Sequence, residues 1–148
     1  MSEMEDVNMW LAVAAKYAAV QIDRKLQPYH LGASLYYFIL KIHDHPGISQ
    51  YELNDIIYID QSGIARGIQQ LVHLNYIDKV RNPDDKRTAN LFLTDSGKQV
   101  YKIVAKEIDE QNSALIAQIP EGRKAQFSKD LKKVGEQIYK LMTTEPGN

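Results

Sequence analysis

The chain has no cysteine, no long hydrophobic run and almost no excess charge of either sign. The absence of cysteine among its 148 residues excludes disulfides and any switch that depends on a thiol. No uninterrupted apolar stretch reaches the length of a membrane span. Acidic residues precede the first apolar run, which is unlike a secretory signal. We therefore expect a cytoplasmic protein with no membrane partner.

The formal net charge of −1 gives no global signal for binding to nucleic acid. Any such function must depend on local charge, and residues 60–90 carry five basic side chains against four acidic ones. The sequence also lacks a glycine-rich phosphate loop, a nucleophile elbow and an HExxH motif. These absences argue against an enzyme, and we expect no cofactor.

Two short helices are predicted in the middle of the chain from their N-terminal signals. Ser49 stands three residues before Glu52, which is the spacing of a capping box, and predicts a helix over 50–57. Asp60 is a good N-cap for a second helix, which we expect to run to about residue 75. Two helices separated by so short a turn are typical of a helix-turn-helix.

The second of these helices has an apolar side and a polar side without a carboxylate. The apolar side is formed by Ile64, Ile68, Leu71 and Val72. The outer side is formed by Ser62, Gly63, Arg66, Gln69, Gln70 and His73. In a major groove, arginine can donate two hydrogen bonds to guanine, and glutamine can pair twice with adenine. Taken alone, the same pattern also fits an ordinary solvated helix face.

A β-hairpin with a charged tip is predicted directly after this helix. Residues 76–81 and 87–93 have the composition of strands, and the residues at 82–86 are typical of a turn. Asp85 and Arg87 are two positions apart and could pair at the tip. Cations on a projection of this kind suit phosphate contacts. The cations on or beside the tip are Lys79, Arg81, Lys86 and Arg87.

Further helices are predicted on both sides of this unit, over 7–26, 33–44, 95–118 and 123–142. The terminal helices carry apolar seams that so short a chain cannot cover by itself, which predicts a two-fold dimer. The expected fold class is mainly α with a small β-hairpin wing. It is a winged helix-turn-helix flanked by N- and C-terminal dimerisation helices.

Four runs of sequence resemble the MarR family of bacterial transcriptional regulators. They lie at 60–66, 74–77, 82–87 and 91–98. The most specific part is a D-x-R pattern in the wing, followed by L-x-L-T-x-x-G. Helix order and spacing outside these runs fit as well, so the resemblance covers nearly the whole chain. It implies a single domain over 1–148, with dimerisation helices at 7–32 and 95–144 and a DNA-binding part at 33–94.

The resemblance implies a homodimeric repressor that binds double-stranded DNA at a pseudo-palindromic operator. The helix at 60–75 would be the recognition helix, Arg87 would enter the minor groove, and Asp85 would order that arginine. Gly63 departs from the family pattern, and its lack of a side chain would allow a close approach to a DNA backbone. The side chains expected to read bases are Ser62, Arg66, Gln69 and Gln70. Those expected at phosphates or at the wing tip are Ser49, Gln50, Lys79, Arg81, Lys86 and Arg87.

Three glycines stand out against the family pattern. Gly63 lies where the family usually has serine or threonine, and Gly67 is a second glycine in the same helix. A glycine inside a helix costs about 0.5–1 kcal/mol relative to alanine, so each needs a reason. For Gly67 the plain interpretation is that it faces the core and relieves crowding. Gly32 replaces a threonine that usually precedes the helix at 33–44, which leaves the cap of that helix open.

The family resemblance also implies a small-molecule effector of phenolic or anionic character. Tyr17, His30, Tyr36 and Tyr37 are the candidates by position, because aromatic walls with one titratable histidine suit such a ligand. The alternative is that these four residues belong to the core and to the subunit interface.

Two rival hypotheses come from other classes of protein. The first is a winged-helix protein-interaction module that does not bind DNA. The second is a metal site at His43, Asp44 and His45. Because these three residues are consecutive, they cannot all point at one ion from a helix face, and no other cluster has ligand spacing. We therefore expect no metal.

Overall fold

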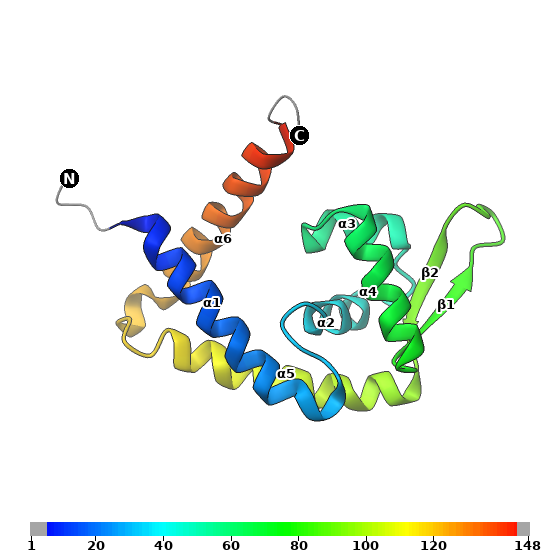
Figure 1. The fold of residues 1–148 in the computed structure, drawn as a ribbon, viewed down its shortest axis with the longest axis horizontal. Helices are drawn as coiled ribbons and strands as arrows, with labels where there is room; N and C mark the ends of the chain where they lie inside the picture. The colour runs from blue at the N-terminus through cyan, green and yellow to red at the C-terminus, as the bar shows by residue number, and fades with distance from the viewer. Residues whose placement is uncertain (1–5, 145–148) are drawn as a thin grey trace. The chain divides into compact units, whose positions relative to one another are not determined.

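The computed structural model describes residues 6–144 of the chain (Figure 1). The chain divides into two units that are described separately, one ending at Ile108 and the other beginning at Asp109. No helix within residues 6–144 has the length and apolar character needed to cross a membrane. The elements are α1 (Val7–Leu26), the 3₁₀ helix η1 (Gln27–Tyr29), α2 (Tyr36–Asp44), α3 (Gln50–Ile57), α4 (Gln61–His73), β1 (Ile77–Arg81), β2 (Ala89–Leu93), α5 (Asp95–Leu115) and α6 (Glu121–Thr144).

The core of the first unit is built from the apolar faces of short helices and one side of the hairpin. Phe38, Ile39 and Ile42 face inward from α2, and the ring of Phe38 lies against Gly67 of α4. Burial of each such side chain stabilises the unit by about 1.5–3 kcal/mol. The largest fully buried side chains are Leu26, Phe38, Ile39, Ile42, Leu53, Ile64, Ile68, Leu71, Ile77, Leu91 and Val104.

Both helices of the helix-turn-helix begin where their caps predict. The amide of Glu52 donates to Ser49 Oγ at 2.9 Å, and the Ser49 hydroxyl is 3.0 Å from Glu52 Oε1. This is a variant of the predicted capping box, because the carboxylate accepts from the hydroxyl of the capping residue. At α4 the amide of Gly63 donates to Asp60 Oδ1 at 2.7 Å. Each cap satisfies an amide that has no partner inside the helix.

The C-terminal end of α4 turns the chain directly into β1. The amide of Tyr76 donates to the Leu71 carbonyl at 3.0 Å, and the amide of Asn75 donates to the Val72 carbonyl at 2.9 Å. These two hydrogen bonds form a Schellman motif, with Asn75 in the left-handed conformation at φ 62°. The helix therefore ends at His73, slightly earlier than predicted.

The buried side of α4 corrects one prediction and confirms another. Val72 is 42% exposed, so its assignment to the apolar side is wrong. It follows the buried Leu71 by one position, and one residue turns a helix by about 100° toward solvent. Gly67 is buried, and a Cβ there would lie 2.5 Å from Cζ of Phe38. The interpretation that Gly67 relieves crowding in the core is therefore correct.

The β1 and β2 strands form the predicted antiparallel hairpin. Its register pairs Ile77 with Leu93 at the base and Arg81 with Ala89 toward the tip. On its other side β2 is hydrogen-bonded to the segment before α3, because the Gly47 amide donates to the Leu91 carbonyl at 2.8 Å. The strands are slightly shorter than predicted. We call residues 77–93 the wing.

The connection before α2 explains the unusual Gly32. The helix begins at Tyr36 and not at the predicted Ala33, and the amide of Ala33 donates to Asp23 Oδ1 of α1 at 2.8 Å. A Cβ on Gly32 would overlap the Asp23 carboxylate. The helix itself has no side-chain cap, and the Asp23 carboxylate instead holds the turn before it, which glycine at position 32 permits.

The second unit consists of the end of α5 and the long helix α6. The predicted break at 120–122 is wrong in part, because α6 begins at Glu121 and includes Gly122. The Arg123 amide donates to the Pro120 carbonyl at 2.9 Å, so the proline lies at the helix start, where its missing amide is harmless. None of the residues of α6 is buried.

Candidate nucleic-acid interface

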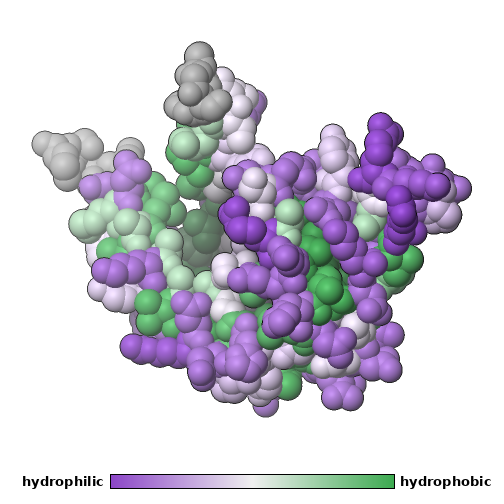
Figure 2. Space-filling model, turned by 45° about the vertical axis from the view of Figure 1, so that its right-hand side comes forward, coloured by the Kyte–Doolittle hydropathy of each residue, from purple (hydrophilic) through white to green (hydrophobic). Residues whose placement is uncertain are grey.

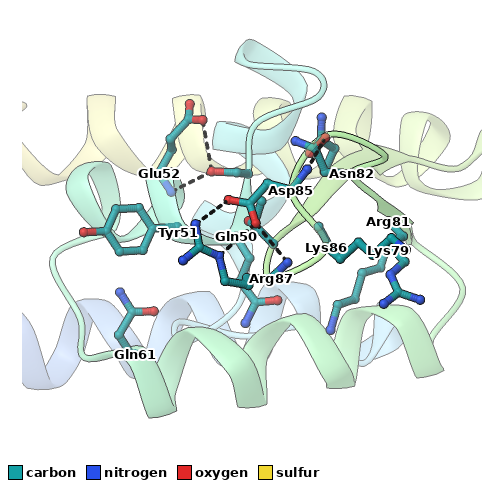
Figure 3. Close-up of a pocket in the computed structure, with 14 residues that line it drawn as sticks. Gln50, Tyr51, Glu52, Gln61, Lys79, Arg81, Asn82, Asp85, Lys86 and Arg87 are labelled. Atoms are coloured by element: carbon teal, nitrogen blue, oxygen red, sulfur yellow. Dashed lines mark hydrogen bonds and ion pairs between the residues drawn. The ribbon is translucent and has the colours of Figure 1, made fainter.

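A groove of about 1060 Å³ lies where the first turn of α3, the start of α4 and the wing meet (Figure 3). We call it the wing groove. It brings together the residues that the sequence predicted at phosphates and at the wing tip. These are Ser49, Gln50, Lys79, Arg81, Lys86 and Arg87.

The predicted pair at the wing tip is present. Asp85 Oδ1 accepts from the backbone amide of Arg87 at 3.1 Å and from its Nε at 3.0 Å. The side-chain hydrogen bond from Arg87, followed by the backbone one, holds the pKa of Asp85 below its ordinary value. The Arg87 side chain is nevertheless 91% exposed. The guanidinium is therefore held in orientation while it stays accessible to a partner (Figure 3).

The turn that carries this pair is ordered by its own first residue. Asn82 Oδ1 accepts from the amides of Asp84 and Asp85 at 2.9 and 3.3 Å. The Thr88 amide donates to the Asp85 carbonyl at 3.2 Å, which closes the tip. An asparagine side chain that mimics the backbone in this way is a common turn device. Strongly hydrophilic residues gather at this projecting end of the first unit in Figure 2.

The outer side of α4 is open, as an element that enters a groove must be. Ser62, Arg66 and Gln69 are exposed, and so are Gln70 and His73. A second hollow, of about 580 Å³, lies beside the C-terminal half of this face. We call it the His30 hollow. It is lined by His30, Leu35, Arg66, Gln69, Gln70, His73 and Leu74.

Ser49 and Gly63, which we predicted to contact DNA, also have structural roles in the helix caps. Ser49 is only 8% exposed, and its hydroxyl is already engaged by Glu52. A Cβ on Gly63 would lie 2.9 Å from Asp60 Oδ1 and 3.3 Å from Ile59 Cδ1. The helix cap therefore favours glycine at this position. Contacts from Ser49 and Gly63 to DNA stay predictions.

The wing groove also contains polar residues that the sequence did not single out. Tyr51 is 71% exposed in the first turn of α3, and Gln61 occupies the equivalent place in α4. Both follow an N-cap by one or two positions, where side chains point away from the core beside free amides. That position relative to Ser49 and Asp60 was the signal that could have found them. Thr88 Oγ1, also in the wing groove, is buried with no hydrogen-bond partner in the described chain.

The candidates for an effector site lie in different surroundings. The rings of Tyr36 and Tyr37 are 5.4 Å apart in an edge-to-face arrangement. Burial raises the pKa of both hydroxyls, and for Tyr37 the neighbouring Tyr36 adds to the effect. Tyr17 is exposed on α1. The His30 hollow has none of these tyrosines among its lining residues. An aromatic effector pocket stays a prediction.

The histidines that raised the question of a metal have other contacts. The His43 ring stacks on Tyr101 with 3.5 Å between the ring centroids, and His43 Nδ1 is 3.2 Å from Asp44 Oδ1. Within residues 6–144, no three histidine, cysteine, aspartate or glutamate side chains gather in a way that could hold an ion.

Comparisons with known proteins agree with this geometry. The family model described as "MarR family" matches residues 36–89. The HTH-type transcriptional regulator YybA of Bacillus subtilis is 28% identical over 103 residues, which cover 70% of this chain and 69% of that protein. The HTH-type transcriptional regulator BilQ of Clostridium symbiosum is 30% identical over 112 residues, which cover 76% of this chain and 78% of that protein.

Solved structures extend the likeness to the whole fold. A MarR family regulator from Listeria monocytogenes, crystallised with 26mer DNA, is 26% identical and superposes with a TM-score of 0.87, covering 98% of this chain and 97% of that one. A SlyA-like regulator from the same organism gives a TM-score of 0.85 at 26% identity, with 98% of this chain and 97% of that one covered. The chain therefore belongs to the MarR family of winged helix-turn-helix transcriptional regulators.

Proposed function

We propose that this chain is a homodimeric repressor that binds a specific pseudo-palindromic sequence in double-stranded DNA. The observation that carries the proposal is the wing tip, where Asp85 orients an almost fully exposed Arg87 beside a groove lined by further cations. Within residues 6–144 the guanidinium of Arg87 is hydrogen-bonded only to Asp85, and most of the side chain is exposed. It suits an anionic surface that the wing would meet, such as a DNA backbone or minor groove.

In this proposal the residues divide by their role on the duplex. Arg66, Gln69 and Gln70 on the exposed face of α4 would read base edges in the major groove, together with Ser62. Gln50, Lys79, Arg81 and Lys86 would hold phosphates and set the register. The local excess of positive charge is small, so a single unit would bind weakly. Two units on one site would supply the affinity.

Dimerisation is supported by the apolar faces that the chain leaves open. α6 has 24 residues, none of them buried, although Leu131, Val134 and Ile138 follow one another at helical spacing. An isolated helix in water is marginal, and most helical stability comes from packing of an apolar face. Exposed apolar residues also line α1, and green patches reach the surface in Figure 2. A second copy is the commonest partner for such faces.

The dimer can be tested at the centre of the α6 seam. Leu131→Lys should turn a dimer into a monomer in sedimentation velocity, because it would bury a charge in an apolar contact. The matched control is Lys133→Ala on the same helix, which should leave the dimer intact. Two recognition helices of one dimer should lie roughly 34–36 Å apart on DNA, so the monomeric variant should also lose most of its operator affinity. A wild-type protein that sediments as a monomer would contradict the proposal.

The effector that the family resemblance implies would act on the equilibrium between two states of the dimer, one able to bind DNA and one unable to. A phenolic or anionic ligand would release the repressor only if it bound the DNA-competent and the incompetent dimer with different affinity.

The experiment that tests the function is a salt series with duplex DNA. Affinity for the duplex upstream of its own gene should exceed that for random sequence, and it should fall with salt at a log–log slope of about −0.9 for each phosphate neutralised. Failure to bind any duplex at low salt would favour the rival hypothesis of a protein-interaction module.

A further inference from the structure

The His30 hollow lies between the connection that follows η1 and the helix α4. His30 belongs to the connection after η1, whereas Arg66 and His73 belong to α4. His30 and α4 are more than thirty positions apart in the sequence, so only the tertiary structure groups them. The hollow is a place where the connection between α1 and α2 reaches the surface that would face DNA.

The backbone holds His30 in a defined position. Its amide donates to the Gln27 carbonyl at 3.0 Å, and its φ of 59° is left-handed. The preceding residue is also tied down, because the Tyr76 hydroxyl donates to the Tyr29 carbonyl at 2.9 Å. The imidazole is exposed on a loop that does not need to become ordered before it can bind.

The titratable or charged side chains that line the hollow can only be positive or neutral. The titratable or charged side chains that line it are His30 from the connection and Arg66 and His73 from α4, and no carboxylate is among the lining residues. Gln69 and Gln70 add amide groups, while Leu35 and Leu74 form the apolar part. A site whose lining has one permanent cation, two imidazoles and no carboxylate is suited to an anion.

The position of His30 beside α4 decides which anion fits. An α-helix is about 10–12 Å in diameter and fills a major groove that is about 12 Å wide. A group that stands beside this helix, as His30 does, or at its last residue, as His73 does, therefore lies toward the rim of the groove. The rim is made of phosphates.

We propose that the His30 hollow binds a DNA backbone phosphate at the rim of the major groove, with His30 and His73 as its donors. Arg66 stays free to reach base edges from the same face. Histidine ordinarily changes its charge between about pH 5 and 8, so protonation of the two imidazoles makes the DNA affinity of this regulator depend on pH. The inference rests on the proposed function, because it requires α4 to enter the major groove.

The test measures operator affinity near pH 6 and near pH 8 at constant ionic strength. Wild-type protein should bind at least about tenfold more tightly at the lower pH, because a single charge-assisted hydrogen bond already corresponds to that factor. His30→Asn and His73→Gln should each reduce this ratio, and the double variant should remove most of it. Asparagine is chosen at position 30 because it tolerates the left-handed backbone. His45→Gln is the control, as it changes an exposed histidine outside the hollow.

A scan of the duplex with single neutral methylphosphonates identifies the source of the anion. One position in each half-site should abolish the pH dependence of wild-type binding without altering that of the double variant. The inference is overturned if the pH ratio is the same in wild type and double variant, or if no methylphosphonate changes it. In both cases tight binding to the operator would leave the proposed function standing, whereas loss of all duplex binding would end both.

Discussion

Replacement of Arg87 by alanine should weaken binding to the operator at least about 100-fold and leave the melting temperature of the protein unchanged. A hydrogen bond to a charged group contributes about 1.5–3 kcal/mol, a dimer loses one guanidinium from each wing, and about 1.4 kcal/mol corresponds to a factor of ten. The fold should not change, because the Arg87 side chain is 91% exposed and, within residues 6–144, its hydrogen bonds go only to Asp85 two residues away. Fluorescence anisotropy and thermal denaturation measure the two quantities.

The controls separate charge from geometry. Arg87→Lys keeps the positive charge but cannot present the flat, forked set of donors, so its affinity should lie between those of wild type and Arg87→Ala. Asp85→Asn should also weaken binding, by less than Arg87→Ala, because the guanidinium remains but loses its orientation. Unchanged affinity of Arg87→Ala would contradict the assignment of the wing tip.

Replacement of Gly97 by alanine should destabilise the protein by about 3 kcal/mol, at the upper end of what overpacking usually costs. A Cβ at this position would overlap the backbone carbonyl oxygen of Tyr76, which is part of the turn between α4 and β1. Backbone cannot move aside as a flexible side chain can. Chemical denaturation should show a lower midpoint, and the variant should lose DNA binding as the wing separates from α5.

Hydrogen bonds next to Gly97 fix the backbone there, so the structure cannot easily make room for an added Cβ. The Thr94 hydroxyl donates to the Asn75 carbonyl at 2.6 Å and accepts from the Gly97 amide at 2.9 Å, while the Thr94 amide donates to Tyr76. Threonine and glycine thus join the two ends of the wing to the start of α5. Gly122→Ala is the matched control, because nothing lies within 4 Å of a Cβ there, and it should leave stability equal or slightly higher. Equal stabilities of both variants would contradict this account.

The elements of the fold that depend on neighbours in sequence were predictable. Ser49 and Asp60 cap their helices by accepting from the amides three residues ahead, and Asn82 orders its turn by accepting from the amides of Asp84 and Asp85. The Thr94 and Gly97 pattern could be recognised as a family signature, and the structure supplies its physical reason. Interactions of this range leave a direct trace in the order of residues.

Features that depend on distant parts of the chain could not be predicted. The hydrogen bond from the turn before α2 to Asp23 joins that turn to another helix ten residues earlier. The exposure of Val72 depends on where the core ends, and that is decided by several elements together. The wing groove was foreseeable because its cations lie within nine positions of one another, whereas the His30 hollow joins two elements that only tertiary structure brings together.

The arrangement of the hairpin has a consequence for solubility. β2 is hydrogen-bonded on both sides, by β1 and by the segment at Gly47, while β1 pairs within the described residues with β2 alone. An open strand edge is a template for pairing with another molecule, and proteins discourage this by placing charge on it. β1 carries Asp78, Lys79 and Arg81 along its short length. The cations that we propose for DNA phosphates therefore also discourage one hairpin from adding to the next, so the same charges would serve two purposes.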